Sequence, residues 1–288
     1  MKHLFFENTS VCIASVGRDS LLDVIRALEK NSNGCLDYFV CLHESIDDVF
    51  LRKLSSIKNV NVCFSSCRHQ VVQRELAVSR ITREYVLQLD DDVLLSRDSL
   101  DSLVNTYESL PPQSALGPVL IKANGDSFFK DLFCPEGFRR LRNIPVILQC
   151  LLLGINNYKD PSKLYGKISR SGNPIGVPSI SSLRFFSKCI EVDFISGGCM
   201  LLESSFARQC GYYPYTRGRA ALEDLYHSAF LQDKGCKLFV DRSAFLVVDA
   251  FDSDTDLSSG FLYLKNTWAA FGKPGVIAFT QYLSPLGS

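Results

Sequence analysis

Short apolar runs alternate with helix-like patterns along the first part of the chain. The runs carry β-branched and aromatic residues and are bounded by turn residues, as expected for buried strands. Helical patterns separate them at residues 21–28, 46–55 and 67–81. Repeated strand–helix units predict a parallel sheet with helices on both faces and ligands at the carboxyl ends of the strands. The four runs are Val11–Val16, Leu36–Leu42, Asn59–Phe64 and Glu84–Leu89.

The second half of the chain is less regular. Ala115–Ile121 is a candidate fifth strand, and residues 122–188 then carry scattered Gly, Pro and Ser. A long irregular stretch inside a compact domain is usually a functional loop or a lid. Beyond it, strands are predicted at Ile190–Ile195, Cys199–Leu202, Cys236–Val240 and Ala244–Val248, and helices at Ala220–Lys234 and Phe261–Phe271.

Composition narrows the class of protein. Of the 288 residues 46% are hydrophobic, and 31 basic side chains balance 31 acidic ones, which argues against a disordered chain and against an electrostatic nucleic-acid binder. The eleven cysteines are an odd number and include no CxxC pair, and no secretory signal precedes them. We therefore expect reduced thiols in a cytoplasmic protein that does not bind nucleic acid.

One apolar segment raises the question of a membrane. Ile144–Ile155 is far shorter than the roughly 20 residues that a spanning helix needs. It follows Arg139, Arg140 and Arg142, and such a segment either packs in the core or lies along a membrane surface. The sequence leaves both options open for residues 139–155, the second of which would place the protein at the inner face of the membrane.

Three consecutive aspartates follow the fourth strand. If the backbone stays extended there, Asp90 and Asp92 point to one side and Asp91 to the other. Two converging carboxylates at the ligand edge of a sheet suit a hard cation such as Mg²⁺ or Mn²⁺. Alternatively, one aspartate caps the helix that starts near Ser96 and the others are solvated in a turn.

Two further motifs could carry chemistry. In the predicted helix 220–234, Glu223 and Asp224 each share a face with His227, so either carboxylate could act as a general base; acidic residues also simply favour helix N-termini. Gly197 and Gly198 permit a close approach of a ligand to the backbone, or form an ordinary bulge. GxGxxG, GxxxxGK[ST], HExxH and GxSxG motifs are absent from the sequence.

The order of these motifs resembles the family 2 glycosyltransferases of the GT-A fold over about residues 10–240. The matching stretches are VCIASVGRDSLLDVIRALEK, RHQVVQRELAVSRITREYVLQLDDD, FISGGCMLLESSFARQCGYY and ALEDLYHSAFLQDKGCKLF. The resemblance implies a single GT-A domain over 1–288: a mainly parallel, Rossmann-like α/β sheet flanked by helices. Residues of about 10–121 would bind the nucleotide-sugar, and about 122–288 the acceptor, with the insertion 122–188 on the acceptor side.

The resemblance also implies roles for individual residues. Asp92 and Asp90 would bind the metal, Mn²⁺ or Mg²⁺, and Asp224 would be the catalytic base, with Glu223 as its neighbour and possible substitute. The nucleotide-sugar would be held by residues at the strand ends and in the glycine segment. These donor-binding candidates are Ser15, Arg18, Glu44, Arg74, Asp90, Asp91, Gly197 and Gly198.

The sequence departs from the family pattern at three places. The acidic turn after the second strand reads CLHESID, so Glu44 is a loose match, and the family's Arg-Asn pair appears as Arg74-Glu75. The late metal-binding histidine has no counterpart after Cys236–Val240, which leaves two options: Asp249 or Asp252 replaces it, or the site binds metal weakly.

The function that the resemblance implies is inverting transfer of a sugar from a nucleoside-diphosphate sugar, with UDP as the expected nucleotide. The expected acceptor is a hydroxyl group of a glycan or a lipid-linked molecule in bacterial surface polysaccharide assembly. Two alternatives remain open at this point, a nucleotidyltransferase and a catalytically silent module that binds a sugar nucleotide.

Overall fold

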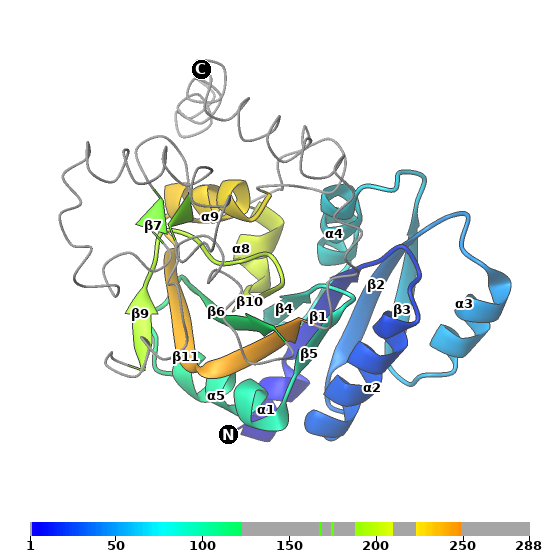
Figure 1. Cartoon of the computed structure of the whole chain (residues 1–288), viewed down its shortest axis with the longest axis horizontal. Coiled ribbons are helices and arrows are strands. Elements are labelled where there is room, and N and C mark those ends of the chain that lie inside the picture. Colours follow the sequence, from blue (N-terminus) through cyan, green and yellow to red (C-terminus); the bar gives the residue numbers. More distant parts are fainter. Residues whose placement is uncertain (1, 123–166, 169–173, 176–187, 210–222, 249–288) are drawn as a thin grey trace, which may run out of the picture.

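A computed structural model of the chain describes residues 2–122, 167–168, 174–175, 188–209 and 223–248 (Figure 1). The first 122 residues alternate helices and strands, as the sequence predicts. Their helices are α1 (Lys2–Glu7), α2 (Ser20–Asn31), α3 (Asp48–Ser55), α4 (Gln70–Ser79) and α5 (Arg97–Tyr107). Their strands are β1 (Thr9–Ala14), β2 (Asp37–His43), β3 (Val60–Ser65), β4 (Tyr85–Leu89), β5 (Val93–Leu95) and β6 (Ser114–Lys122).

The remaining described elements come from the second half of the chain. Two short strands, β7 (Lys167–Ile168) and β8 (Pro174–Ile175), pair only with each other among the described residues. The others are β9 (Cys189–Glu191), β10 (Cys199–Glu203), α8 (Ser204–Gln209), α9 (Glu223–Asp233) and β11 (Lys237–Val248). The predicted helix Phe261–Phe271 lies outside the described residues.

A mainly parallel sheet of nine strands forms the centre of the fold. Its order is β3-β2-β1-β4-β10-β6-β11-β5, with β9 also paired to β11. β3, β2, β1 and β4 are parallel neighbours, β6 and β11 are parallel to each other, and β10, β5 and β9 run against their neighbours. The chain reverses its direction of travel across the sheet between β1 and β4, so these two strands flank the switch point where α/β proteins bind ligands.

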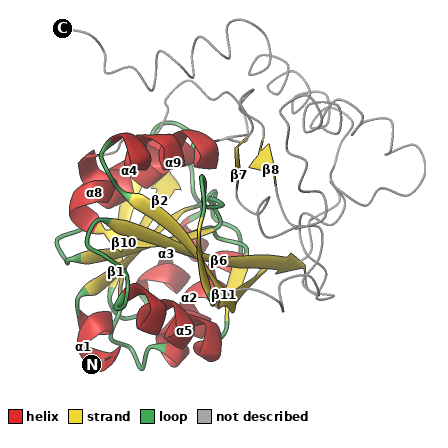
Figure 2. Cartoon of the chain, turned by 90° about the vertical axis from the view of Figure 1, so that its left-hand side faces the viewer, coloured by secondary structure: helices red, strands yellow, loops and turns green. Residues whose placement is uncertain are grey.

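Helices cover both faces of this sheet, because the strands are apolar on both sides (Figure 2). Val11 and Ile13 of β1 join the cluster formed with α1, α2, α3 and α5, while Cys12 joins the cluster formed with α4, α8 and α9. This alternation is the period-two pattern of a doubly covered strand. The eight cysteines among the described residues are all free thiols.

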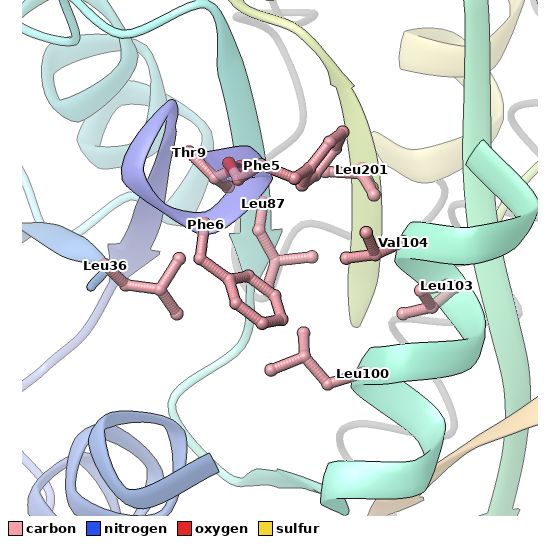
Figure 3. A pocket seen from close by; sticks show the side chains of 9 residues that line it. All are labelled: Phe5, Phe6, Thr9, Leu36, Leu87, Leu100, Leu103, Val104 and Leu201. Carbon is pink, nitrogen blue, oxygen red and sulfur yellow. Dashed lines mark hydrogen bonds between the residues drawn. The ribbon is translucent and has the colours of Figure 1, made fainter. Parts of the chain in front are cut away.

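The amino ends of the strands are closed by apolar packing. Phe5 and Phe6 of α1 line an apolar pocket together with Leu87 and Leu100, and the Phe6 ring points toward Leu100 (Figure 3). Phe5 also stacks on Tyr85, with ring centroids 4.5 Å apart. Thr9 of β1 is the one polar residue among the described residues that line this pocket. The other lining residues are Leu36, Leu103, Val104 and Leu201.

The sequence predicts two strands where the structure has one long strand, β11. Cys236–Val240 and Ala244–Val248 were predicted as separate strands, whereas β11 runs through both and changes register against β6 between Asp241 and Phe245. The Asp241 carboxylate is buried and accepts hydrogen bonds from Ser102 Oγ at 2.7 Å and Thr106 Oγ1 at 2.8 Å. The polar residues that interrupt the apolar pattern therefore mark a bulge, held against α5, and not a turn.

Candidate active site at the carboxyl ends of the strands

The loops that follow β1 and β4 meet at the switch point. The two strands are parallel and Ile13 lies in register with Leu89, so residues 15–18 and 90–92 leave the sheet side by side. Ser15 Oγ donates a hydrogen bond to Asp91 Oδ2 at 2.5 Å and accepts one from the Gly17 backbone N–H at 2.9 Å. The first loop and the aspartates therefore form one polar cluster, which we call the strand-end cluster: Ser15, Arg18, Asp90, Asp91 and Asp92.

The aspartates do not alternate as an extended strand would require. β4 ends at Leu89, and Asp91 and Asp92 form a turn before β5 begins at Val93. Asp90 consequently faces α4, whereas Asp91 and Asp92 both reach Arg18. The expectation that Asp90 and Asp92 converge on one side, with Asp91 opposite, is therefore wrong, because the backbone leaves the extended conformation at the end of β4.

Asp90 is held by side chains of α4. Arg74 Nη2 forms an ion pair with Asp90 Oδ1, and Gln70 Nε2 donates to the same oxygen at 2.7 Å. Burial raises the pKa of the Asp90 carboxyl above its usual value, and the nearby Arg74 charge opposes that rise. The Arg74 side chain is only 1% exposed, so it acts inside the protein and its guanidinium is shielded from a nucleotide.

Asp91 and Asp92 differ in their exposure to solvent. Asp91 is buried and burial raises its pKa, while the hydrogen bond from Ser15 and the charge of Arg18 act in the opposite direction. Asp92 has a side chain 41% exposed, with Arg18 Nη1 at 3.1 Å from its Oδ2. Of the three carboxylates, Asp92 is thus the one that solvent and a ligand reach most readily.

The glycine segment is joined to the cluster through its carbonyl groups. Arg74 Nη2 donates to Gly197 O at 3.1 Å, and the Asp90 backbone N–H donates to Gly198 O at 3.1 Å. Neither glycine has a positive φ, and a Cβ at Gly198 would lie 3.4 Å from Leu246, which is ordinary contact. The segment therefore serves here through backbone acceptors, and not through the conformational freedom of glycine.

Helix α9 is attached to the same segment. Ser228 Oγ accepts a hydrogen bond from the Ile195 backbone N–H at 3.1 Å, in a buried position. Burial, together with the nearby charge of Arg74, lowers the pKa of His227 to about 3, so its imidazole is neutral at neutral pH. Asp224, which is partly exposed, lies three and four residues before His227 and Ser228 and so shares their face of the helix. Glu223 begins α9, one position before Asp224.

Glu44 lies apart from these contacts. It follows β2, its side chain is exposed, and its backbone N–H donates to Ser65 O at 3.1 Å. Its neighbour Ser45 receives hydrogen bonds from Arg68 Nη2 at 2.9 Å and shares one with His43 Nδ1 at 2.7 Å. The structure therefore puts Glu44 on the same edge of the sheet as the strand-end cluster, because β1 and β2 are parallel neighbours, without a direct contact to the cluster among the described residues.

The donor set decides which metal the cluster could hold. Within the described ranges no three His, Cys, Asp or Glu side chains gather as a metal site. Mg²⁺ and Mn²⁺ need only one or two carboxylates when phosphate oxygens complete their coordination. Asp92 fits that requirement as a partly exposed oxygen ligand. Asp90 fits through Oδ2 only, because Arg74 and Gln70 both bind its Oδ1.

Two polar residues of α4 escaped the sequence analysis. Gln70, four residues before Arg74, binds Asp90, and Gln73 Nε2 donates to the carbonyl of Ser15 at 2.9 Å and to that of Cys41 at 3.3 Å. Their spacing is the available signal, because Gln70, Gln73 and Arg74 fall on one face of a helix. A polar stripe on a helix that covers a buried sheet indicates that the stripe has partners at the strand ends.

Several predictions lie outside the described residues. They include Asp249 and Asp252 as late metal ligands, the arginines at 139, 140 and 142, and the segment 139–155. None of the helices in the described ranges is long and apolar enough to cross a membrane.

Comparison with known proteins supports the fold. No family model matches the sequence, and no curated protein does. Among solved structures, the chain is similar to GalNAc-T7 in a crystal structure with UDP, GalNAc and Mn²⁺, with a TM-score of 0.59 and 14% sequence identity. The match covers 95% of this chain and 49% of the GalNAc-T7 chain, so this chain spans about half the length of that similar structure. The predicted fold class, a mainly parallel α/β sheet of the GT-A type, is confirmed; membership of family 2 stays a prediction.

Proposed function

We propose that the protein is an inverting glycosyltransferase that moves a sugar from a nucleoside-diphosphate sugar, with UDP as the nucleotide, to an acceptor hydroxyl. One observation carries the proposal: Arg74 connects Asp90 to Gly197, and Ser228 connects Ile195, two residues before Gly197, to the helix of Asp224. Acidic groups suited to a metal and to a base thus sit on elements bonded to one another. The UDP, GalNAc and Mn²⁺ in the similar structure support this class of donor.

The donor would bind along the strand-end cluster. We assign the nucleotide to the loop of Ser15 and Arg18, with Glu44 at the neighbouring strand end, and a divalent cation to Asp92, the most exposed of the three carboxylates. When bound, such a cation neutralises the charge that develops on the departing diphosphate. Arg74 does not touch the donor in this scheme; it fixes the direction of the Asp90 carboxylate and of the Gly197 carbonyl.

Asp224 would be the general base. Its carboxylate accepts the proton of the acceptor hydroxyl while that oxygen attacks the anomeric carbon on the side opposite the diphosphate. The bond between the anomeric carbon and the diphosphate oxygen breaks in the same step, so the configuration inverts. His227 does not compete for this role, because its imidazole is buried and its pKa lies at about 3.

The acceptor is proposed on chemical grounds alone. Residues 122–188 are long enough to form the acceptor side, and the arginines at 139, 140 and 142 beside an apolar segment suit an acceptor carried by anionic lipid. We therefore propose that the reaction takes place at the cytoplasmic face of a membrane, in the assembly of a surface glycan. Cosedimentation with anionic vesicles at low salt is the expected behaviour, and its absence would remove the membrane from the proposal.

The substitution Asp224→Asn tests the chemistry. It removes the base and keeps the shape, so we expect turnover to fall by roughly 10²–10⁴-fold while UDP–Mn²⁺ affinity changes by less than about twofold. The matched control is Asp233→Asn, which makes the same change at the exposed far end of α9. Release of UDP from UDP-sugars measures turnover, and calorimetry measures binding. Unchanged turnover in Asp224→Asn would transfer the role to Glu223 or to another group.

The same assay separates the alternatives. Release of nucleoside diphosphate in the presence of Mn²⁺ supports sugar transfer, whereas release of pyrophosphate from a nucleoside triphosphate and a sugar phosphate indicates nucleotidyl transfer. Binding of UDP-sugar with neither product indicates a catalytically silent binding module. Each result selects one function for the strand-end cluster.

A further inference from the structure

Two arginines share the three aspartates unequally. Arg74 comes from α4 and is almost wholly buried, and it holds Asp90. Arg18 comes from the loop after β1, and its Nη1 lies 3.1 Å from Asp92 Oδ2 and 3.5 Å from Asp91 Oδ1. The Arg18 side chain is 43% exposed and its partner Asp92 41% exposed. The Arg18 pair is therefore the more exposed of the two, because Arg74 is only 1% exposed and its partner Asp90 26% exposed.

The difference in burial decides which arginine can leave. An exposed ion pair is screened by water and salt and contributes little to stability, whereas separating a buried pair leaves an uncompensated charge inside the protein. A divalent cation that needs Asp92 can thus displace Arg18 at small cost, but cannot displace Arg74. The backbone need not move, because Gly17 N–H bonds Ser15 Oγ and Leu21 N–H bonds the Arg18 carbonyl at 3.1 Å, so only the side chain exchanges partners.

We propose that Arg18 is an exchangeable counter-ion of Asp91 and Asp92, an inference that rests on the proposed function. Without ligands, its guanidinium neutralises Asp91 and Asp92. When a divalent cation takes Asp92, the guanidinium is released and pairs with the diphosphate of the donor, whose oxygens suit its planar fork. Arg18 thereby weakens binding of the metal alone and strengthens binding of the metal together with a nucleoside diphosphate.

The test compares Mn²⁺ binding with and without UDP. Mn²⁺ binding is measured by electron paramagnetic resonance titration of the wild-type protein, Arg18→Gln and Arg18→Lys. We expect Arg18→Gln to bind Mn²⁺ alone roughly threefold to tenfold more tightly, because a competing positive charge is gone, and to bind UDP in saturating Mn²⁺ about tenfold more weakly. Arg18→Lys keeps the charge and should fall between the two.

Arg26→Gln is the matched control. It removes the same charge from an exposed arginine on the neighbouring helix α2, where Arg26 Nη1 lies 3.8 Å from Asp23 Oδ1. We expect both affinities to stay at wild-type values. Thermal unfolding of each variant at the wild-type temperature verifies that the folded protein is being compared.

The outcomes separate this inference from the proposed function. If Asp92→Asn abolishes Mn²⁺ binding but Arg18→Gln binds Mn²⁺ no more tightly than the wild type, the counter-ion role is wrong while the metal site stands. If neither the wild type nor Arg18→Gln binds Mn²⁺ at millimolar concentration, the metal role of Asp92 and the counter-ion role fall together. Tighter Mn²⁺ binding with weaker UDP binding in Arg18→Gln establishes the exchange.

Discussion

At the amino ends of the parallel strands Arg83 Nη1 donates to the carbonyls of Phe6, Thr9 and Cys35, at 3.2, 3.0 and 2.8 Å, and its Nε lies 2.6 Å from Asp37. At the carboxyl ends of the same strands Arg74 binds a carboxylate and the carbonyl of Gly197. The first arginine, Arg83, ties the backbone of α1 to the start of β1 and to the segment before β2. The second orients an acidic group that borders solvent.

The comparison separates structure from function within one sheet. The amino end is filled by α1 and by apolar side chains (Figure 3). The partners of Arg83 there are three main-chain carbonyls and the Asp37 carboxylate. The carboxyl end gathers three carboxylates, two arginines and a buried neutral histidine around exposed loops. An arrangement that brings like charges together costs stability, and proteins retain such costs mainly where they bind or react with something.

The largest expected effect comes from replacing Arg74 and Arg83 by glutamine, one at a time. Arg74→Gln leaves the Asp90 charge without its buried partner, and we expect the free energy of unfolding to fall by about 3–5 kcal/mol. Arg83→Gln loses charge-assisted hydrogen bonds and should cost about 2–3 kcal/mol. In the folded protein only the Arg74 change should weaken UDP–Mn²⁺ binding. Urea unfolding gives the stabilities and calorimetry gives the affinities.

A second variant keeps this prediction usable if Arg74→Gln does not fold. Arg74→Lys retains the charge but loses the planar fork that joins Asp90 to Gly197, so we expect a smaller loss of stability with UDP affinity still reduced. Equal losses of UDP affinity in the Arg74 and Arg83 variants would show that the two ends of the sheet do not differ in role.

A pair of glycines offers the next contrast. Gly17 has φ of +87° in the loop after β1, and a Cβ there would lie 1.9 Å from Ile46 Cδ1. Gly34 has φ of +73° in the turn before β2, with nothing within 4 Å of such a Cβ. Alanine pays for the left-handed conformation at both positions, about 1 kcal/mol, and at Gly17 must also move the packed Ile46 side chain, about 1 kcal/mol more.

We therefore expect Gly17→Ala to lower the free energy of unfolding by about 2 kcal/mol and Gly34→Ala by about 1 kcal/mol. Because the Gly17 N–H bonds Ser15 Oγ, only Gly17→Ala should also disturb the loop that carries Arg18 and so reduce UDP–Mn²⁺ affinity. Wild-type affinity in folded Gly17→Ala would separate this loop from donor binding.

The sequence predicted the strands and helices of the first half more fully than the contacts at the carboxyl ends of the strands. Strands β1 to β4 lie within two residues of their predicted runs. For β1 and β4 the reason is that a strand covered on both faces leaves a continuous apolar signal. β5 was missed because its three residues are too few to show a period, and α1 because its six residues were not separated from the terminus. The antiparallel direction of β10 depends on pairing that no local pattern records.

The candidate site shows the same division. The aspartate run was singled out because three carboxylates follow a buried strand, and the glycine pair because it permits a close approach to the backbone. Arg74 was singled out through the family resemblance alone. Which arginine holds which aspartate was not predictable, since it depends on the turn at Asp91 and on a helix sixteen residues earlier in the chain. The bond from Ile195 to Ser228 spans 33 residues and likewise leaves no local signal.

The smallest expected effect concerns pH and the docking of α9. The pKa of His227 lies at about 3 in the folded protein and near 6.5 when unfolded, so the unfolded chain takes up the proton first. Its contribution is complete above about pH 6.5 and is lost as the pH falls toward 3. Between about pH 7.5 and pH 5.5 the free energy of unfolding of the wild type should therefore fall by about 1 kcal/mol more than that of His227→Gln.

Asp90 and Asp91, whose pKa values are raised, act in the opposite direction in both proteins, so the difference between the two urea titrations isolates the histidine. Parallel pH profiles would mean that His227 does not lie buried beside Arg74, and the helix of Asp224 would then lose its place at the carboxyl end of the sheet.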